Sequence, residues 1–464
     1  MKKVKIGFLP LYIKLYDDKD PSLRIPMLGH KDAAIAMLKN EGLEVVEAPV
    51  CRISAEFMAA KELFNQEQVD AVVTLHLAYS PSLESIGALL ACDAPIVVLD
   101  STITYDLYGR MLEADIDSNH GIHGVQDMCN LLKRNGKQYF VEAGHLLHSD
   151  VVARVAADCR AIKAAWAYKS ARIGIVGKPF QGMGDFYISD EDLKNSIGAQ
   201  IVHYSPAEAR DYLSRVTEEE IDAELEKDRR MFCVEVRQEE NYRAAVKTGL
   251  ALRKWAAEKK LSAYTVSFLD ATAENGLLKM PFPELCKAMM SGTGYAGEGD
   301  TLTAGLVGAL LSVYPDTTFA EVFCPDWKND LLLLSHMSEM NLSLSSFQPV
   351  VADKPFSYAE SGDTVGSYGS MRGGSATLVN VAPMGGGKYT LILAPVQMQE
   401  IGREHGGYRY VVQGWLKPPM PVADYLEQYS LAGGTHHSAL VYGAGPEELR
   451  VFGEVMGFDV TIIR

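Results

Sequence analysis

The sequence predicts an α/β protein, with flavodoxin-like N-terminal and central αβ domains followed by a C-terminal domain that resembles an antiparallel β-barrel. Two observations lead to this. Apolar, strand-like runs alternate with helical stretches over most of the chain, and towards the C-terminus long helices give way to strand-like runs and paired glycines. The 464 residues suffice for about three domains of ~150 residues each. We expect these domains at residues 1–168, 169–320 and 321–464.

Composition narrows the functional class. Hydrophobic residues make up 47% and charged residues 22%, which is typical of a globular protein in water. The net charge of -16 argues against nucleic acid as a partner, since binding phosphates requires a basic face. It does not exclude an anionic small ligand in a locally basic pocket. No apolar run reaches the ~18 residues of a membrane span, so we expect no membrane partner either.

The seven cysteines are scattered and form no C-x-x-C motif. This pattern favours reduced thiols over a disulfide framework or a zinc ribbon. The N-terminus is basic and then apolar, but the apolar run Val4–Leu9 is too short for a signal peptide. We therefore expect a cytoplasmic protein whose first apolar run is a buried strand.

Several buried strands are predicted in the N-terminal domain. Val69–Leu77 and Ala94–Asp100 are the clearest after the first run, and helical stretches separate them. Strands joined by helices imply right-handed crossovers and a parallel sheet. In such sheets ligands bind beyond the carboxyl ends of the strands. Those ends carry the segments Leu11–Asp17, His76–Pro81 and Ser101–Tyr105.

The central domain is expected to begin after a long helical stretch, Asp150–Ala167. A strand at Ala171–Gly177 then leads into a glycine-rich loop, Lys178–Asp185. Further strands are expected at Ile201–Tyr204 and Ala263–Phe268. Thr217–Lys259, which precedes the last of these strands, is charged and has helical spacing.

The C-terminal domain is expected to be antiparallel. Strand-like runs at Ser375–Val381, Tyr389–Pro395 and Tyr408–Val412 alternate with glycine-containing turns. This pattern is typical of an antiparallel sheet or barrel.

One G-x-G-x-x-G motif occurs, at Gly292, Gly294 and Gly297. A dinucleotide fingerprint must follow a strand, whereas this motif follows the helical segment Pro283–Met290. We therefore interpret it as a flexible loop that opens a helix, with a nucleotide site as the less favoured alternative. Two carboxylates, Glu298 and Asp300, follow the motif. A carboxylate at this position commonly caps the helix.

Four further residues could carry chemistry. Glu321 lies in an apolar run, so it is either a surface residue of an edge strand or a buried functional carboxylate, which needs a partner or a metal. His336 follows the apolar run Leu331–Leu334, and a lone histidine in this position is more often a core residue than a functional one. His436–His437 follow Gly433–Gly434, and glycines permit close approach of the backbone.

Two glutamates with one or two histidines form an oxygen and nitrogen donor set. Such a set suits Mn²⁺ or another octahedral divalent ion that leaves positions open for water or substrate. A bound ion of this kind polarises a carbonyl and orients neighbouring hydroxyls. Two carboxylates beside a substrate can move a proton between adjacent carbons.

These residues lie in segments that resemble those of L-arabinose isomerases, in the same order. The segments are Gly294-Tyr-Ala-Gly-Glu298-Gly-Asp300, Thr318-Phe-Ala-Glu321, Ser335-His336-Met337 with Glu339 following, and Ala432-Gly-Gly-Thr-His436-His437. In the N-terminal half, Asn119-His120-Gly121-Ile122-His123-Gly124 is similar to the family's Asn-Gln-x-x-His-Gly, and Tyr79-Ser80-Pro81 to its Phe-Ser-Pro. The chain thus resembles a divergent member of the L-arabinose and L-fucose isomerase superfamily over most of its length.

The resemblance implies a metal-dependent aldose–ketose isomerase. The matching residues Glu298, Glu321, His336 and His437 would bind Mn²⁺, with Co²⁺ or Mg²⁺ as possible substitutes. The two glutamates would also act as acid and base through an enediol intermediate, and His436 would contact the substrate. It also implies a homotrimer or homohexamer, in which N-terminal residues of one subunit complete a neighbour's pocket.

The sequence departs from the family where the sugar would be bound. Ile13 stands where the family has glutamine, His120 replaces another glutamine, Tyr79 replaces phenylalanine, and His123 is retained. With Lys14, these side chains predict the same reaction on a sugar other than L-arabinose. That sugar is either a neutral pentose or deoxyhexose, or an acid-substituted aldose such as a sulfo- or phosphosugar. The alternative is a non-catalytic sugar- or metal-binding protein of the same fold.

Overall fold

The computed structural model describes residues 3–111, 113–401 and 409–464. The chain divides into two compact units, Met1–Lys163 and Ala164–Arg464. The finer division at residues 168 and 320 remains our proposal for the domain organisation. Within the described residues, no helix is both long and apolar enough to cross a membrane.

The first unit contains a five-stranded parallel sheet in the order β2-β1-β3-β4-β5. This is the strand order of flavodoxin-like folds, so the prediction for the N-terminal domain is confirmed. The strands are β1 (Lys5–Leu11), β2 (Glu44–Glu47), β3 (Ala71–His76), β4 (Ile96–Asp100) and β5 (Tyr139–Ala143).

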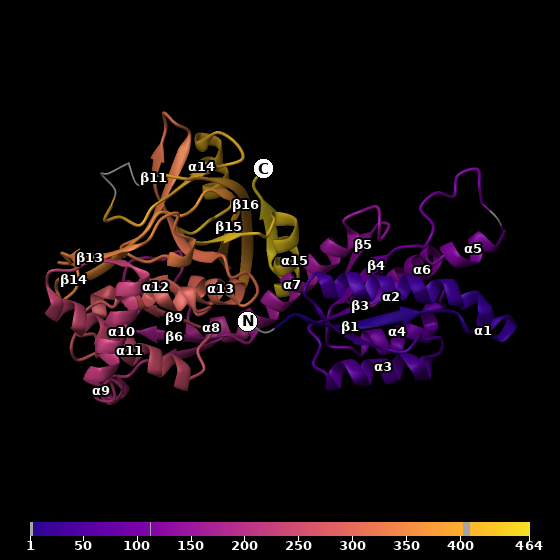
Figure 1. Ribbon diagram of the computed structural model, residues 1–464, viewed down its shortest axis with the longest axis horizontal. Coiled ribbons are helices and arrows are strands. Elements are labelled where there is room, and N and C mark those ends of the chain that lie inside the picture. The colour runs from indigo at the N-terminus through magenta and orange to yellow at the C-terminus, as the bar shows by residue number, and fades with distance from the viewer. Residues whose placement is uncertain (1–2, 112, 402–408) are drawn as a thin grey trace. The chain divides into compact units, whose positions relative to one another are not determined.

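Helices cover both faces of this sheet, with α2 (Ile25–Asn40) on one face and α3 (Ser54–Gln66) on the other (Figure 1). The core on the α3 side joins strand residues such as Val72 to Phe64 of α3 and to residues of the next helices. Gly7 of β1 permits this packing, since a Cβ there would lie 2.6 Å from the Phe64 ring. The remaining helices are α1 (Lys14–Lys19), η1 (Pro21–Arg24), α4 (Ser82–Leu90), α5 (Glu113–Asn119), α6 (Ile122–Arg134) and α7 (Val151–Lys169).

The second unit begins with a four-stranded parallel sheet in the order β10-β9-β6-β7. Its strands are β6 (Arg172–Val176), β7 (Gln200–His203), β9 (Ala263–Val266) and β10 (Gly294–Gly297). Its helices are α8 (Asp190–Ser196), α9 (Pro206–Ser214), α10 (Glu218–Met231), α11 (Glu239–Glu258), η2 (Phe268–Asp270), α12 (Phe282–Met290) and α13 (Thr301–Leu311).

The interpretation of the G-x-G-x-x-G segment as a flexible loop is wrong, because Gly294–Gly297 is the fully buried strand β10. The strand is short and glycine-rich, so neither hydrophobic alternation nor propensity indicated it. Packing requires a glycine at position 294. A Cβ at Gly294 would lie 2.3 Å from the backbone nitrogen of Gly308 in α13, so glycine lets the helix cross the strand closely.

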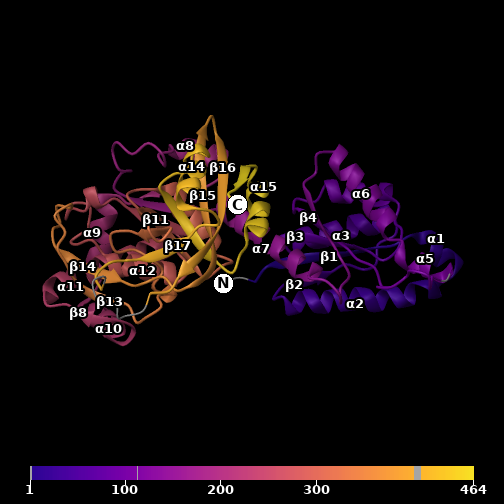
Figure 2. The ribbon, with the colours of Figure 1, turned by 90° about the horizontal axis from the view of Figure 1, so that it is seen from above.

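The C-terminal strands form a closed, six-stranded antiparallel barrel, as predicted. The sheet order is β15-β18-β11-β12-β17-β16, and pairing of β15 with β16 closes it. The strands are β11 (Thr317–Asp326), β12 (Leu331–Ser335), β15 (Gly374–Gly385), β16 (Lys388–Gln399), β17 (Gly414–Lys417) and β18 (His437–Tyr442). β19 (Asp459–Ile462) adds to β16 in parallel, and α15 (Pro446–Met456) packs beside β16 (Figure 2).

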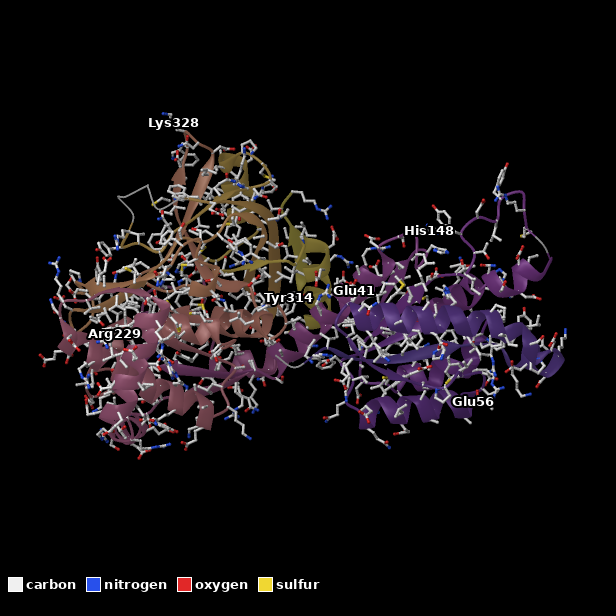
Figure 3. The ribbon with its side chains drawn as sticks, viewed as in Figure 1. Glu41, Glu56, His148, Arg229, Tyr314 and Lys328 are labelled. Carbon is white, nitrogen blue, oxygen red and sulfur yellow. The ribbon has the colours of Figure 1, made fainter. Side chains whose placement is uncertain are left out.

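The remaining elements form a three-stranded sheet, a short turn and one helix. They are β8 (Cys233–Glu235), β13 (Val350–Lys354), β14 (Thr364–Tyr368), η3 (Leu342–Leu344) and α14 (Val422–Leu431). The turn between β11 and β12 carries Lys328 at the outer end of that hairpin (Figure 3).

The strand expected at Tyr408–Val412 does not form in its described part, and Tyr408 itself lies outside the described residues. Arg409 and Tyr410 form a turn instead. Their side chains bond to Glu235 of β8, with the Tyr410 hydroxyl donating to the carboxylate at 2.8 Å. A polar contact to another element therefore replaces strand pairing here.

Candidate metal centre

Glu298 occupies a tight turn between β10 and α13. Its φ of 63° lies in the left-handed region, which is uncommon for a residue with a side chain and is concentrated at functional sites. Its backbone oxygen accepts a hydrogen bond from the Phe180 amide at 2.9 Å. The residue is 7% exposed. The turn therefore places a carboxylate in a buried position at the carboxyl end of a parallel strand.

Asp300 provides the helix cap expected at this turn. Its Oδ1 accepts from the Thr303 amide at 2.8 Å at the start of α13. Because Asp300 caps the helix, the carboxylate of Glu298 is free for another role.

The barrel brings together the other three proposed metal ligands, Glu321, His336 and His437. Glu321 on β11 stands opposite Ser335 on β12 and opposite His437 on β18. His336 follows Ser335 directly at the end of β12. The strand register therefore collects residues that are more than a hundred positions apart in the chain.

The donor atoms form two overlapping groups. Glu298, His436 and His437 make one, and Glu321, His336 and His437 make the other, with the ligand atoms in each group within 4.8 Å of one another. The Nε2 atoms of His436 and His437 lie 3.8 and 3.7 Å from Glu298 Oε2. The Nε2 atom of His336 lies 3.8 Å from Glu321 Oε2. All four proposed ligands thus lie at one place, and His436 lies there too.

A carboxylate holds the Nδ1 atom of each histidine. Glu339 lies 2.8 Å from His336 Nδ1 and Asp300 2.9 Å from His437 Nδ1. This arrangement fixes the rings and turns each Nε2 towards the centre, as the outer partners of metal-bound histidines do.

His436 is held in the same way by Asp185, whose Oδ2 lies 2.5 Å from Nδ1 and accepts from the His436 amide at 3.0 Å.

Two buried nitrogens fit a cation. Among the described residues, Nε2 of His436 and Nε2 of His437 have no hydrogen-bond partner. A buried polar atom without a partner is costly. Nitrogen donors with a free lone pair beside two carboxylates are what a divalent ion requires. The residues present therefore fit a bound divalent metal.

Aromatic rings enclose the histidines. Phe319 packs edge-on against His336 and His437, with ring centroids 4.9 Å apart in both pairs. Phe186 stacks on His437 at 5.2 Å. Gly297 leaves room for His336, since a Cβ there would lie 2.5 Å from its Cε1. The site is thereby shielded from water on these sides.

The two glutamates differ in proton affinity. Burial raises the pKa of both carboxyl groups, but around Glu298 the three nearby histidines outweigh it, so the pKa of Glu298 is lowered. At Glu321 burial dominates, and its pKa is raised. Burial lowers the pKa of His436, yet the carboxylates of Glu298 and Asp185 outweigh this and raise it to about 9.

Sequence reasoning missed the roles of Asp185, Asp300 and Glu339 in holding the histidines. Asp185 could have been found, because it ends the glycine-rich loop that follows β6, at the carboxyl edge where ligands bind. Glu339 lies three residues after His336, within the quoted motif. Glu339 is buried and Asp185 is half-buried, and the contacts of both with the histidines are seen only in the folded chain.

The N-terminal residues expected to contact substrate lie in the first unit. His120 and His123 pack edge-to-face with ring centroids 5.4 Å apart, and Tyr79 packs on His123 at 6.5 Å. The Tyr16 hydroxyl lies 3.1 Å from His120 Nε2. Lys14 is exposed and pairs with Asp18 at 2.6 Å. Three of the four thus form one cluster, and Lys14 is separately paired.

Comparison with known proteins identifies the family. Residues 191–314 match the model for the L-arabinose isomerase central domain, and residues 316–459 match the model for the L-arabinose isomerase C-terminal domain. The chain is 26% identical to an L-arabinose isomerase of Geobacillus kaustophilus (strain HTA426) over 86% of this chain and 81% of that protein. It is 24% identical to that of Bacillus subtilis (strain 168), over 87% and 82%.

Among solved structures, an arabinose-binding periplasmic protein from Shewanella sp. ANA-3 is 12% identical and covers 67% of this chain and 84% of its own, with a TM-score of 0.16. A score this low carries no argument. The family models and the relatives span the centre and barrel described above. The chain belongs to the L-arabinose isomerase family, and is thus an aldose–ketose isomerase, an intramolecular oxidoreductase that acts on a sugar.

Proposed function

We propose that the protein is a Mn²⁺-dependent isomerase that converts an aldose other than L-arabinose into its ketose through an enediol. The observation that carries this proposal is the convergence of Glu298 and Glu321, from two different elements, on His437. Each carboxylate lies beside a histidine whose Nδ1 atom is hydrogen-bonded to a second carboxylate.

Glu298, Glu321, His336 and His437 would hold the metal. Their oxygen and nitrogen atoms suit Mn²⁺, and Co²⁺ or Mg²⁺ accept the same types of ligand. When bound, such an ion polarises the sugar carbonyl and orients its hydroxyl groups. His436 faces the same centre, and its imidazole would bond to a substrate hydroxyl.

The two glutamates would move the proton. The carbon beside the carbonyl loses a proton while the carbonyl oxygen gains one, which gives the enediol. The former carbonyl carbon then gains a proton while the neighbouring hydroxyl loses its own, which gives the ketose with no net oxidation. One of the two carboxylates would take up the carbon proton and the other would return one. Before any metal binds, the pKa of Glu298 is lowered and the pKa of Glu321 is raised. Phe186 and Phe319 limit the access of water to this exchange.

The substrate is proposed to be a neutral pentose or deoxyhexose. Tyr79, His120 and His123 offer hydroxyl and imidazole groups, which bond to sugar hydroxyls without adding a fixed charge. Lys14 is the one proposed contact with a permanent charge, and Asp18 neutralises it. A sulfo- or phosphosugar is therefore the second candidate.

A panel of aldoses with Mn²⁺, assayed for ketose formation, tests the substrate. We expect turnover of at least one neutral aldose with a kcat/KM above that of L-arabinose and of acid-substituted aldoses. Preference for L-arabinose would contradict the proposed change of substrate. Preference for a charged aldose, reduced in Lys14→Ala, would favour the second candidate. Metal-dependent sugar binding without turnover of any aldose would favour the non-catalytic alternative.

We further propose a cytoplasmic homotrimer or homohexamer, in which Tyr79, His120 and His123 of one subunit complete the pocket of the next. Light scattering, measured on the protein as it elutes from a size-exclusion column, gives the number of subunits directly. A monomer with full turnover would contradict the shared pocket.

A further inference from the structure

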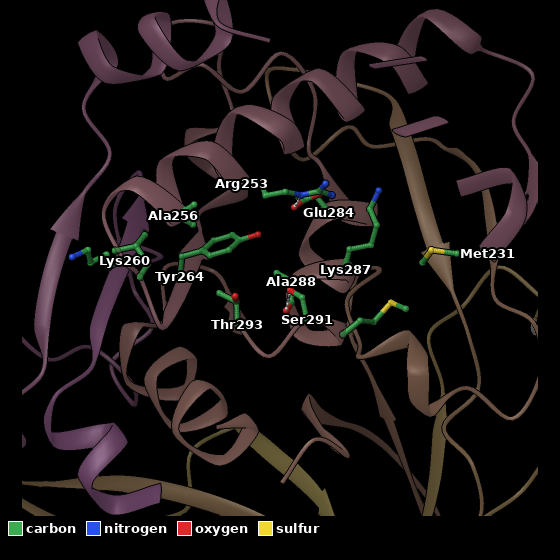
Figure 4. Close-up of a pocket in the computed structure, with 13 residues that line it drawn as sticks. Met231, Arg253, Ala256, Lys260, Tyr264, Glu284, Lys287, Ala288, Ser291 and Thr293 are labelled. Carbon is green, nitrogen blue, oxygen red and sulfur yellow. Dashed lines mark hydrogen bonds and ion pairs between the residues drawn. The ribbon is translucent and has the colours of Figure 1, made fainter. Parts of the chain in front are cut away.

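A cavity of about 510 Å³ lies in the second unit, away from the metal centre. Its walls come from α11, α12 and the residues at the start of β9 and β10, as the close-up shows (Figure 4). Thr293 lines the cavity just before β10, whereas Glu298 follows the other end of that strand. The cavity and the metal centre thus lie at opposite edges of the same parallel sheet.

Tyr264 gives the cavity a hydrogen-bond donor without a protein partner. The residue is on β9, lines the cavity and is 2% exposed. Its hydroxyl has no hydrogen-bond partner among the described residues. Figure 4 shows this hydroxyl pointing into the space in front of Glu284 and Lys287. A buried hydroxyl that bonds to nothing is costly, and a ligand in the cavity would satisfy it.

The charges of the wall are already paired. Arg253 donates to Glu284 at 2.8 and 2.5 Å, and to Glu224 at 3.0 and 2.8 Å. Lys287 donates to Glu224 at 2.7 Å and to Asp228 at 2.9 Å. An anionic ligand would have to compete with these carboxylates for both cations. A cationic ligand would have to displace Arg253 or Lys287.

The charged Lys260 lies at the rim of the cavity and is exposed. Water and salt screen the charge of Lys260, so this charge does not change which ligands the interior of the cavity favours. The wall therefore favours a neutral ligand.

The remaining groups can bond to hydroxyls. The Tyr264 hydroxyl donates, the Glu284 carboxylate has lone pairs beyond those that accept from Arg253, and Ser291 and Thr293 offer hydroxyls. Apolar wall residues such as Ala288 lie between these polar groups. Apolar walls with a few converging polar groups are typical of small-molecule sites, and alternating C–H and hydroxyl surface is the chemistry of a polyol.

We propose that this cavity is a second binding site, specific for a neutral polyol such as a sugar or sugar alcohol. It is separate from the metal centre and does not depend on the function proposed there. Loss of isomerase turnover leaves this site unchanged, and loss of this site leaves the four proposed metal ligands in place.

Calorimetric titration with xylitol tests the proposal. Xylitol has no carbonyl and is not isomerised, and an excess of EDTA removes any binding that requires the metal. We expect the full-length protein in EDTA to retain one xylitol site per chain. In Tyr264→Phe, which removes an oxygen with no protein partner, the Kd of this site should weaken about five- to tenfold with the melting temperature unchanged.

Two further variants complete the test. Ala257→Trp fills the cavity from an exposed position on α11 and should abolish EDTA-resistant binding. Tyr204→Phe is the matched control, because Tyr204 is also buried with an unpartnered hydroxyl but does not line the cavity. It should bind as the wild type does. Absence of EDTA-resistant binding in the wild type would overturn the proposal, as would binding that neither Tyr264→Phe nor Ala257→Trp alters.

Discussion

In the proposed mechanism, Glu298 and Glu321 each supply two properties in one carboxylate, a negative charge for the metal and a site for the proton. Replacing Glu298 or Glu321 with glutamine keeps the size of the side chain and removes both. We expect Glu298→Gln and Glu321→Gln each to lower kcat by at least ~10²–10⁴-fold, with the melting temperature close to that of the wild type. Steady-state assays with Mn²⁺, together with metal analysis, measure this. Near-full activity of either variant with metal bound would show that the two-carboxylate mechanism is wrong.

We expect His336 and His437 to contribute chiefly to affinity for the metal. His336→Ala and His437→Ala each remove one nitrogen donor from the centre. We expect the Kd for Mn²⁺ to rise by at least ~10–100-fold, and excess Mn²⁺ to restore part of the activity. Metal titration followed by calorimetry gives the affinity. If both variants bind Mn²⁺ as the wild type does, neither histidine is a ligand.

At the residue scale, the sequence predicts the donors better than the groups that hold them. Glu298, Glu321, His336 and His437 are each ambiguous alone, but their segments, taken together and in order, resemble a known family and so indicate the set. The Asp185–His436 and Asp300–His437 contacts span 251 and 137 positions. Only the folded chain brings such residues together, so local pattern does not indicate them.

At the scale of the element, α13 and the barrel meet at Asp300, which caps the helix with one oxygen and holds His437 with the other. Asn caps a helix as well as Asp does. In Asp300→Asn, α13 should therefore keep its cap while His437 loses its charged partner. We expect ~10–100-fold weaker Mn²⁺ binding with little change in melting temperature.

The control for this prediction is Asp190→Asn, because Asp190 also pairs with a histidine, His203, at 2.6 Å but on the surface. This variant should bind Mn²⁺ as the wild type does. Equal Mn²⁺ affinity in Asp300→Asn and Asp190→Asn would contradict the role of Asp300.

Elements were predictable where hydrophobic pattern determines them. The buried runs of β3 and β4 are recognisable in sequence because both faces of a parallel sheet are covered. Strand β10 was not recognisable in the sequence, because the glycines that let α13 pack on it leave no side chains to form the hydrophobic pattern of a strand. The charged stretch Thr217–Lys259 was predicted as helical, but the break at β8 between α10 and α11 was not.

At the scale of the molecule, stability should depend on pH through His76 in the first unit. It is 4% exposed at the end of β3, and burial lowers its pKa to about 3. Its ordinary pKa is about 6.5, so the unfolded chain binds a proton between these values and the folded chain does not. Stability is therefore lost as pH falls from about 6.5 towards 3.

Between pH 7 and pH 5 this one group should lower the free energy of unfolding of its unit by about 2 kcal/mol. Thermal melts at the two pH values measure the effect, with His76→Leu as the variant that cannot titrate. The shift in melting temperature between pH 7 and pH 5 should be smaller in His76→Leu. An identical shift in both proteins would show that His76 titrates normally or does not report on this unit.

The overall architecture and the family follow from motifs spread along the chain, since the order of the four metal-centre segments is retained. The identity of the sugar substrate does not follow from these motifs. We propose that substrate choice depends on Tyr79, His120 and His123, which lie in the first unit, whereas the candidate metal centre lies in the second. The motifs indicate the chemistry of the reaction, but they do not indicate the shape of the pocket around the sugar.

The central claim is that a divalent metal held by Glu298, Glu321, His336 and His437 is required for isomerisation of an aldose. Dialysis against EDTA, followed by stepwise return of Mn²⁺ with ketose formation measured at each step, tests it most directly on the sugar with the highest turnover. We predict that activity falls to background after dialysis and returns in proportion to bound Mn²⁺, saturating at one ion per chain. Full turnover by protein shown by metal analysis to hold far less than one ion per chain would contradict the account.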